Sequence, residues 1–142
     1  MSERDQGEHA DEVEHLYLAV ENILDLFADR FGCSVADAAD QLRNKDGLAS
    51  AVDRPRMYAH YQGADIALQA AVLAHGIAEG QVFVDGNKTT ALLAMLTFLD
   101  INGFSLSGPD DKELAQWILD LSSGESAEDL ADRIRPSLSE AS

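Results

Sequence analysis

Two segments of this chain are apolar on nearly every side of a helix, and this pattern constrains the fold more than any other feature. They are residues 66–78 and 91–99, and only a short loop that contains glycines separates them. A helix without a polar face must be covered by other parts of the protein. We therefore predict that these two helices form the centre of the structure and that the other helices pack around them.

Residues that start and stop helices divide the rest of the chain. Apolar residues recur at three- and four-residue spacings over residues 10–31, which predicts an amphipathic helix there. Asp46 is suited to cap a short helix that ends before Pro55, and Asp85 is suited to cap the second central helix. No stretch alternates as a strand does, so the predicted class is all-α. Further helices are predicted over residues 35–42, after the cap Ser34, over residues 65–79, and from Asp85 to about Ile101. Asp110 and Asp111 open another helix, which stops near Gly124. Ser126 and Asp129 cap the last predicted helix, which ends before Pro136.

The net charge of −16 is concentrated at the two ends of the chain. Residues 1–42 carry a net charge of −9 and residues 100–142 carry −7, whereas residues 43–99 hold five acids and five bases. Nucleic-acid binding needs a basic surface, so the charge argues against nucleic acid as the main partner. The acidic ends either form a solvated surface that keeps the protein soluble or attract a basic partner protein.

Length and composition indicate one cytoplasmic domain. The 142 residues, of which 46% are hydrophobic, suit a single domain over 1–142, with a core at about 14–136 and acidic ends that we expect to be flexible. The longest apolar stretch, residues 90–99, is shorter than the about 20 residues that span a bilayer, and the polar start of the chain does not resemble a secretion signal. A membrane is therefore not expected as a partner. The single cysteine, Cys33, fits a reducing cytoplasm and is expected to pack as a small apolar residue.

The loop between the two central helices, residues 79–88, is the most informative stretch of the chain. Its glycines allow close approach of the backbone, and the first N–H groups of the following helix lack partners within that helix. The amides from Gly86 to Lys88 could hold a phosphate, and Asn87 could donate its side-chain amide to a phosphate oxygen. Asp85 is an oxygen ligand suited to Mg²⁺ beside the same phosphate. A capped turn without any ligand is the alternative that these residues leave open.

This loop and the segments around it resemble a known family. Residues 83–88 read Phe-Val-Asp-Gly-Asn-Lys, and with residues 90–99 and Asn102-Gly103 they resemble the signature loop and helix of the Fic/Doc family. The short Doc-type (death-on-curing) toxins, whose motif reads His-Pro-Phe-x-Asp-Gly/Ala-Asn-Lys-Arg-Thr-Ala, are the nearer branch. Residues 42–56 resemble the Doc pattern before its substrate-binding flap. The resemblance extends over about residues 14–136 and implies a compact helical bundle in which the motif loop joins two central helices.

The resemblance implies a nucleotide-dependent transferase. Fic proteins commonly transfer AMP from ATP to a hydroxyl of a target protein, whereas Doc toxins transfer the terminal phosphate to elongation factor Tu and are restrained by a small antitoxin. In both, the motif histidine is the base, the acid binds Mg²⁺ and the turn after it cradles phosphate. Carried over to this chain, Asp85 would hold the metal, and ATP or another nucleotide would bind at Gly86, Asn87, Lys88 and Thr89. Phe83 would anchor the loop in the core.

Two positions depart from the family's motif. Gln81 stands at the histidine position and Thr89 at the arginine position, while Val82 replaces the common proline. Glutamine cannot act as a general base, and the loss of such a base typically slows a reaction by about 10²–10⁴-fold. Threonine offers one neutral hydroxyl in place of a bidentate phosphate clamp. Catalysis at Gln81 is therefore expected to be impaired.

Two histidines of the sequence could substitute for the missing base. His60 is the candidate, because it lies where Doc relatives carry the flap, and its alternative role is that of an exposed loop residue. His75 is expected to be a core or interface histidine, since it lies on an apolar helix. By the same resemblance, residues 54–64 are expected to present an edge on which an extended chain could dock.

Two functions of different classes remain open at this point. One is a divergent, toxin-like transferase whose catalysis is impaired or altered. The other is a catalytically inactive binding or regulatory protein that keeps the fold and the anion site. A base replaced on purpose to tame a toxin would explain Gln81 but hardly Thr89 as well.

Overall fold

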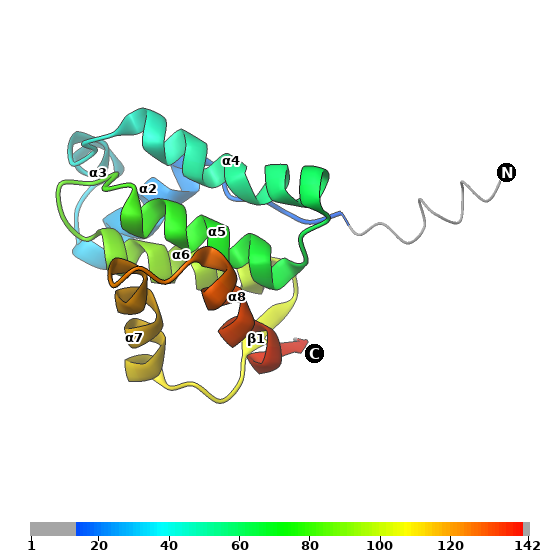
Figure 1. The fold of residues 1–142 in the computed structure, drawn as a ribbon. Helices are drawn as coiled ribbons and strands as arrows, with labels where there is room; N and C mark the ends of the chain where they lie inside the picture. Colours follow the sequence, from blue (N-terminus) through cyan, green and yellow to red (C-terminus); the bar gives the residue numbers. More distant parts are fainter. Residues whose placement is uncertain (1–13, 141–142) are drawn as a thin grey trace, which may run out of the picture.

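The computed structural model describes residues 14–140, which form a helical bundle with one small two-stranded sheet (Figure 1). The all-α class predicted from the sequence is confirmed. No helix among these residues is long and apolar enough to cross a membrane. In chain order the elements are α2 (Val20–Phe31), α3 (Val35–Asp40), α4 (Lys45–Gln62), α5 (Ile66–Glu79), α6 (Asn87–Ile101), β1 (Phe104–Leu106), α7 (Asp111–Ser122), α8 (Ala127–Ile134), the 3-10 turn η1 (Arg135–Ser137) and β2 (Leu138–Glu140).

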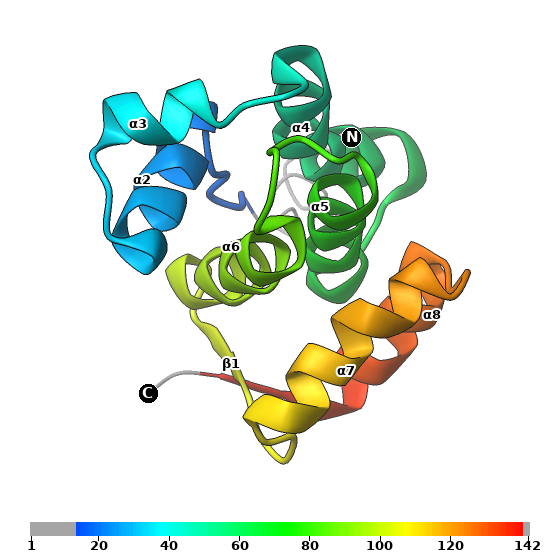
Figure 2. The same ribbon diagram turned by 90° about the vertical axis from the view of Figure 1, so that its left-hand side faces the viewer.

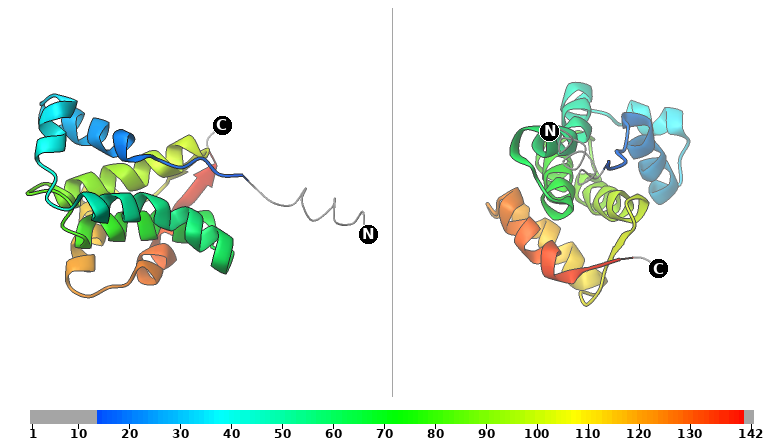
Figure 3. Two further views of the ribbon diagram at one scale, coloured as in Figure 1. Left: turned by 90° about the horizontal axis from the view of Figure 1, so that it is seen from above. Right: turned by 90° about the vertical axis from the view of Figure 1, so that its right-hand side faces the viewer.

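Helix α5 forms the centre of the bundle, as its apolar sequence predicts. Eleven of its fourteen residues are buried, and it packs against α4, α6, α7 and α8. Helices α2 and α3 lie on one side of the α5–α6 pair, whereas α7 and α8 lie on the other (Figure 2 and Figure 3). The N-cap of the helix is Asp65, which was predicted as its first residue, and the C-cap is Gly80. The loop that follows therefore leaves the bundle at one end of its central helix.

Helix α6 is buried along one side only, which differs from the prediction that both central helices are fully wrapped. Leu92, Leu93 and Leu96 are half-buried. Within residues 14–140 no element covers this side of α6 completely, although α2 and α7 both contact the helix. Its buried residues are Thr90, Ala91, Ala94, Met95, Phe98 and Leu99.

Helix α4 corrects two predictions from the sequence. Its cap is Asn44, whose side-chain oxygen accepts a hydrogen bond from the Gly47 N–H at 2.9 Å, rather than Asp46. The helix also continues through Pro55 to Gln62 instead of ending before the proline. Proline removes one backbone hydrogen bond from a helix. Because Pro55 is buried and α4 packs along α5, tertiary packing offsets this loss.

The continuous helix also corrects the prediction of a docking edge at residues 54–64. The backbone groups of a helix bond to one another and are not free to pair with an extended chain. This segment is helical as far as Gln62, and Gly63 ends the helix in the left-handed conformation with φ of 63°. Residues 54–62 therefore present helical side chains rather than an open backbone edge.

The first described segment, residues 14–19, is not helical, although a helix was expected over residues 10–31. The side chain of Asn102 accepts a hydrogen bond from the Leu16 N–H at 2.8 Å and donates to the Leu16 carbonyl at 3.0 Å. The Tyr17 hydroxyl donates to the buried Gln69 at 2.9 Å. These tertiary contacts replace the hydrogen bonds of a helix, so α2 starts only at Val20. Residues 10–13 of the predicted helix lie outside the described part of the chain.

A short sheet joins the end of α6 to the end of the described chain. Strand β1 pairs antiparallel with β2, so that Phe104 lies opposite Glu140 and Leu106 lies opposite Leu138. The sequence analysis missed both strands, because three residues are too few to show an alternating pattern. The α7–α8 hairpin returns the chain to β1 and so creates the pairing.

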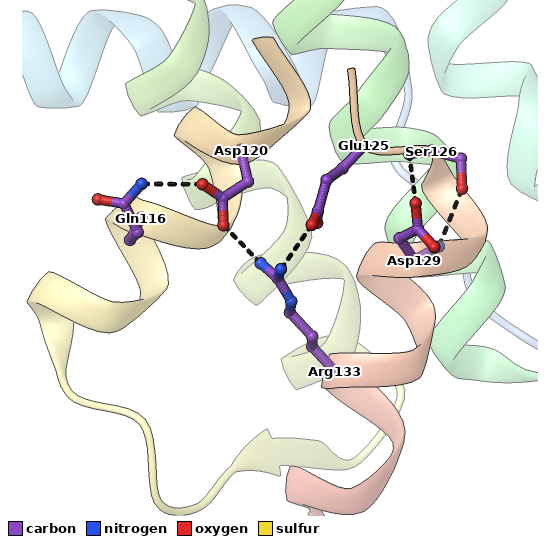
Figure 4. Close-up of polar contacts among 6 residues, drawn as sticks. All are labelled: Gln116, Asp120, Glu125, Ser126, Asp129 and Arg133. Carbon is purple, nitrogen blue, oxygen red and sulfur yellow. Dashed lines mark hydrogen bonds and ion pairs between the residues drawn. The ribbon is translucent and has the colours of Figure 1, made fainter. Parts of the chain in front are cut away.

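Helices α7 and α8 are linked by a polar cluster around Arg133 (Figure 4). The guanidinium of Arg133 contacts Asp120 and Glu125, each at 2.7 Å. Gln116 also donates to Asp120, at 2.9 Å. Hydrogen bonds from Gln116 and Arg133 hold the pKa of Asp120 below its ordinary value of 3.8. The predicted capping box of Ser126 and its partner three residues later is confirmed at the start of α8.

The pKa of Asp120 predicts how this cluster responds to acid. A carboxylate whose pKa is lower in the folded protein stabilises the fold above its unfolded pKa, and this contribution is lost as the pH falls through the folded value. We expect Arg133→Gln to lower the free energy of unfolding at pH 7, and the difference from wild type to shrink below about pH 3.8. Urea unfolding at a series of pH values measures this, with Lys112→Gln as an exposed control on α7. A pH-independent difference would contradict the assignment.

Gly76 allows α5 to approach α4 closely. A Cβ at this position would lie 2.9 Å from the Cβ and 3.2 Å from the Cα of Ala51, which is itself fully buried. Real carbon contacts are longer, so a methyl group there would push the two helices apart. Because the segment that leads into α4 contacts the loop after α5, this spacing helps to position that loop.

Gly76→Ala is therefore expected to destabilise the protein despite the higher helix propensity of alanine. Overpacking costs about 1–3 kcal/mol and the propensity returns roughly 1 kcal/mol, so a net loss of about 1 kcal/mol is expected. Combining Gly76→Ala with Ala51→Gly moves the methyl group to the other helix. The double variant should be more stable than the sum of the two single effects, as measured by urea unfolding. Additive effects would show that the two positions do not share one contact.

Candidate functional site

The loop between α5 and α6 is anchored by one aromatic side chain. Phe83 is fully buried and stacks on Phe27 with 4.3 Å between the ring centroids. The neighbouring Val84 is exposed. Just before this anchor, Gln81 adopts a positive φ of 48°, which is uncommon for a residue with a side chain. The predicted role of Phe83 as the core anchor thus agrees with its packing.

The loop is also held by the segment that leads into α4. The backbone N–H groups of Arg43 and Asn44 donate to the Val82 carbonyl at 2.8 and 3.1 Å. The Val84 N–H donates to the Gln41 carbonyl at 2.8 Å. Residues 41–44 therefore run antiparallel to residues 82–84. This pairing, which sequence reasoning did not predict, brings Arg43 to the loop.

The N-cap of helix α6 is Gly86 rather than the predicted Asp85. Gly86 has a φ of 85°, and a Cβ on it would lie 2.8 Å from the ring of Phe31, so only glycine fits this turn. The carboxylate of Asp85 accepts from the Gly86 N–H at 2.8 Å and does not cap the helix. It therefore leaves the first turn of α6 to other partners.

The first turn of α6 has no side-chain cap. Within residues 14–140, the backbone N–H groups of Asn87, Lys88 and Thr89 donate to no acceptor. Unpaired N–H groups at a helix start carry partial positive charge and suit an anion. By contrast, α3, α4, α5, α7 and α8 each have a side chain that accepts from the first turn. The start of α6 can thus still accept an oxygen ligand.

The Asn87 side chain holds the loop to the helix. Its oxygen accepts from the Phe83 N–H at 2.8 Å, and its amide donates to the Phe83 carbonyl at 3.0 Å. Thr90 adds a hydroxyl bond to the Gly86 carbonyl at 2.8 Å. The Asn87 side-chain amide was predicted to donate to a phosphate oxygen, and one of its two N–H groups is already used within the loop. A phosphate contact by the other amide proton of Asn87 stays a prediction.

Four polar side chains lie around the loop and the start of α6. Asp85 and Lys88 are exposed, and Thr89 is half-buried. Gln81 is exposed, and its side-chain oxygen accepts a hydrogen bond from the Arg43 guanidinium at 3.1 Å. The predicted residues 81 and 85–89 thus belong to one corner of the molecule, where the loop meets the first turn of α6.

The donor set fits magnesium only together with phosphate. Among residues 14–140 no group of three or more His, Cys, Asp or Glu side chains could hold a metal ion. Asp85 supplies one carboxylate, of which one oxygen is bonded to the Gly86 N–H. Magnesium is commonly held by one or two carboxylates together with phosphate oxygens and water. This corner therefore fits magnesium that arrives with a nucleotide rather than a resident ion.

A pocket of about 470 Å³ opens beside the loop, on the side of α2 and α3. Phe27 and Phe31 contribute aromatic rings to its lining, and Asp37, Asp40 and Asp85 contribute carboxylates. Its volume lies within the about 300–1,000 Å³ that small-molecule sites occupy. The carboxylates would repel phosphate from this pocket, so an anion would be favoured on the Lys88 side of the loop.

The structure does not bring His60 to the loop. Helix α4 starts next to the loop and runs away from it, so the exposed His60 lies about 22 Å farther along the helix. With His15 it lines a different pocket, near the start of α5. His75 is half-buried and lines a third pocket, between α4, α5 and α8. None of the histidines in the described residues therefore borders the pocket at the loop. Cys33 is half-buried and packs against the core, as expected.

Comparison with known proteins shows to which family this chain belongs. The model of the Fic/DOC family matches residues 11–99, which include α5, the loop and nearly all of α6. The chain belongs to the Fic/DOC family. This Fic/DOC protein is also 33% identical over 105 residues to Toxin Doc of Mycolicibacterium smegmatis, and the match covers 72% of this chain and 77% of that toxin. The predicted likeness to the Doc-type branch is thereby confirmed.

The two bonds from Asn87 to Phe83 predict a structural role that can be measured. Asn87→Ala removes both, and their loss in a half-buried place is expected to lower the free energy of unfolding by about 1–3 kcal/mol. The Phe83 amide should also exchange its hydrogen faster. Lys88→Ala is the control, because Lys88 is exposed and its substitution should change stability by less than about 0.5 kcal/mol. Equal stabilities of the two variants would contradict this role.

Proposed function

We propose that this protein is a toxin-like Fic/DOC transferase of reduced activity. It binds ATP or another nucleotide, with Mg²⁺, where the loop meets α6. From ATP it transfers to a hydroxyl of a target protein either AMP, with release of pyrophosphate, or the terminal phosphate, with release of ADP. The observation that carries the proposal is the uncapped first turn of α6, flanked by the exposed Lys88 and Asp85. Family membership supports the same reading.

Each polar residue of the loop has its own role in the proposed nucleotide binding. The amides of Asn87 and Lys88, with the ammonium group of Lys88, attract the phosphate oxygens. Asp85 has one carboxylate oxygen free of the Gly86 bond and would hold the magnesium ion, which neutralises phosphate charge when bound. Thr89 contributes at most one hydroxyl. The pocket lined by Phe27 and Phe31 is large enough for the nucleoside.

Gln81 accounts for the reduced rate. The target hydroxyl must lose a proton as it attacks phosphorus, and a glutamine amide cannot take that proton at neutral pH. The Gln81 oxygen is moreover engaged by Arg43 at 3.1 Å. With no histidine of the described part at the loop, the proton passes to solvent water. Transfer is then expected to be about 10²–10⁴-fold slower than with a positioned base.

The similarity to Toxin Doc supports a toxin–antitoxin setting for this protein. A toxin of this type acts on a cellular protein and is restrained by a small antitoxin, so we propose an antitoxin partner for this chain. An elongation factor Tu-like protein is the target proposed from the family resemblance. The strongly acidic ends of the sequence favour a partner with a basic surface.

An inactive binding or regulatory protein is the second candidate function. It is favoured by the same contact that lowers the rate, because Gln81 lacks a basic nitrogen and is bonded to Arg43. In that case the corner at α6 would bind a nucleotide without transferring any part of it. The two functions differ in whether a covalently labelled protein forms.

Incubation with radiolabelled ATP, Mg²⁺ and cell extract separates the two functions. Label from the α-phosphate would show transfer of AMP, and label from the γ-phosphate alone would show transfer of phosphate. We expect slow labelling of a protein that is lost in Asp85→Ala, because that variant has no carboxylate for the metal. Nucleotide binding without any labelling would instead support the inactive binding protein.

Restoring the motif is a second test of the proposed activity. Histidine tolerates the positive φ of residue 81 better than most side chains, so Gln81→His with Thr89→Arg should fold normally. We expect this double variant to label its target about 10²–10⁴-fold faster than wild type. Expression of the double variant in cells should also slow their growth. An inert double variant that still binds ATP would argue against a preserved acceptor site.

A further inference from the structure

Arg43 is a cation at the loop that has no ion-pair partner in the described residues. One of its guanidinium N–H groups donates to Gln81 at 3.1 Å, and no carboxylate of residues 14–140 lies within ion-pair distance. The other arginines near acids are neutralised: Arg56, Arg133 and Arg135 each contact an aspartate at 2.7 Å. Arg30 and Arg54 also form no ion pair within residues 14–140, but Arg43 is the arginine whose guanidinium is bonded to a side chain of the loop.

Backbone hydrogen bonds fix the position of the Arg43 backbone relative to the loop. The Arg43 N–H is bonded to the Val82 carbonyl, and the next residue of the loop, Phe83, is bonded at both its N–H and its carbonyl to Asn87 in the first turn of α6. Arg43 and the open amides of α6 are thus attached to adjacent residues of one short segment. The Arg43 side chain is bonded to Gln81, two residues before Phe83 on the same segment.

We infer that Arg43 supplies the phosphate-binding guanidinium that Thr89 cannot supply. This inference rests on the proposed function, since it concerns the nucleotide bound at the same corner. Arginine presents five N–H donors in a planar fork that matches phosphate oxygens, and only one of them is used by Gln81. The remaining donors bind the nucleotide phosphates beside the first turn of α6.

Gln81 is then a positioning residue rather than a base. Its side-chain oxygen orients the Arg43 guanidinium through the bond at 3.1 Å. Both departures from the family motif thereby have one explanation. In this chain a cation on the segment before α4 takes the part of the motif arginine, and residue 81 holds it in position.

Binding of ATP with Mg²⁺ to the full chain, measured by titration calorimetry, tests this role without depending on activity. Arg43→Ala should weaken binding by about 10- to 100-fold, because a charge-assisted hydrogen bond to phosphate is lost. Arg43→Lys should weaken it less, since lysine keeps the charge but not the fork. Arg56→Ala on α4 is the matched control: it removes the same charge from an exposed arginine and should leave the affinity within about twofold. Thermal unfolding verifies that each variant is folded.

Gln81→Asn tests the positioning role. Asparagine tolerates the positive φ of residue 81 but is one methylene too short to hold Arg43 in the same way. It should weaken ATP binding by about 2- to 10-fold, because Arg43 must then be ordered by the nucleotide. In the Arg43→Ala background the same change should have no further effect. Independent effects of the two substitutions would overturn the positioning role.

A rescue experiment identifies the function of the guanidinium. Thr89→Arg in the Arg43→Ala background should restore ATP affinity to within a few-fold of wild type, because the motif arginine and Arg43 would serve one purpose. Unchanged affinity in Arg43→Ala would overturn this inference alone and leave the proposed nucleotide site standing. If wild type does not bind ATP with Mg²⁺ at all, the proposed function fails, and the role of Arg43 fails with it.

Discussion

Burial of the apolar helix α5 is the constraint on which the rest of the structure depends. A helix whose residues are almost all buried needs neighbours on every side, and α4, α6, α7 and α8 provide them. Gly76 lets α4 come close, and this fixes where the segment before α4 meets the loop after α5. The candidate site therefore inherits its geometry from helix packing. It lies where the central helix ends and the chain must turn back into α6.

At that corner, most of the side chains with polar groups have a structural task as well as a chemical one. Asn87 ties the loop to α6, Asp85 engages the Gly86 amide, and Gln81 contacts Arg43. What remains available is a helix start with open amides and two exposed cations, Lys88 and Arg43. Such a corner suits phosphate, but among residues 14–140 no histidine borders it that could act as the base. In the function that we propose, phosphate binding and proton transfer therefore depend on different groups.

Several features could be predicted from local sequence because local physics produces them. Ser34, Asp110 and Ser126 cap their helices as expected, since capping depends on residues only three positions apart. Other predictions failed where distant residues competed with local preference. Asn102 captures the backbone of Leu16 and prevents a longer first helix, and packing on α5 carries α4 through Pro55. His60 was a plausible base only as long as the direction of α4 was unknown.

The amino-acid sequence by itself determined the all-α class, the central position of α5 and the identity of the loop that carries the family motif. These follow from hydrophobic periodicity, from capping residues and from a run of residues in one place. Only the tertiary structure decided which group faces which across that loop. The pairing of residues 41–44 with residues 82–84 joins positions almost forty residues apart, and it alone brings Arg43 to Gln81. Such contacts arise from the packing of whole helices, which no short stretch of sequence specifies.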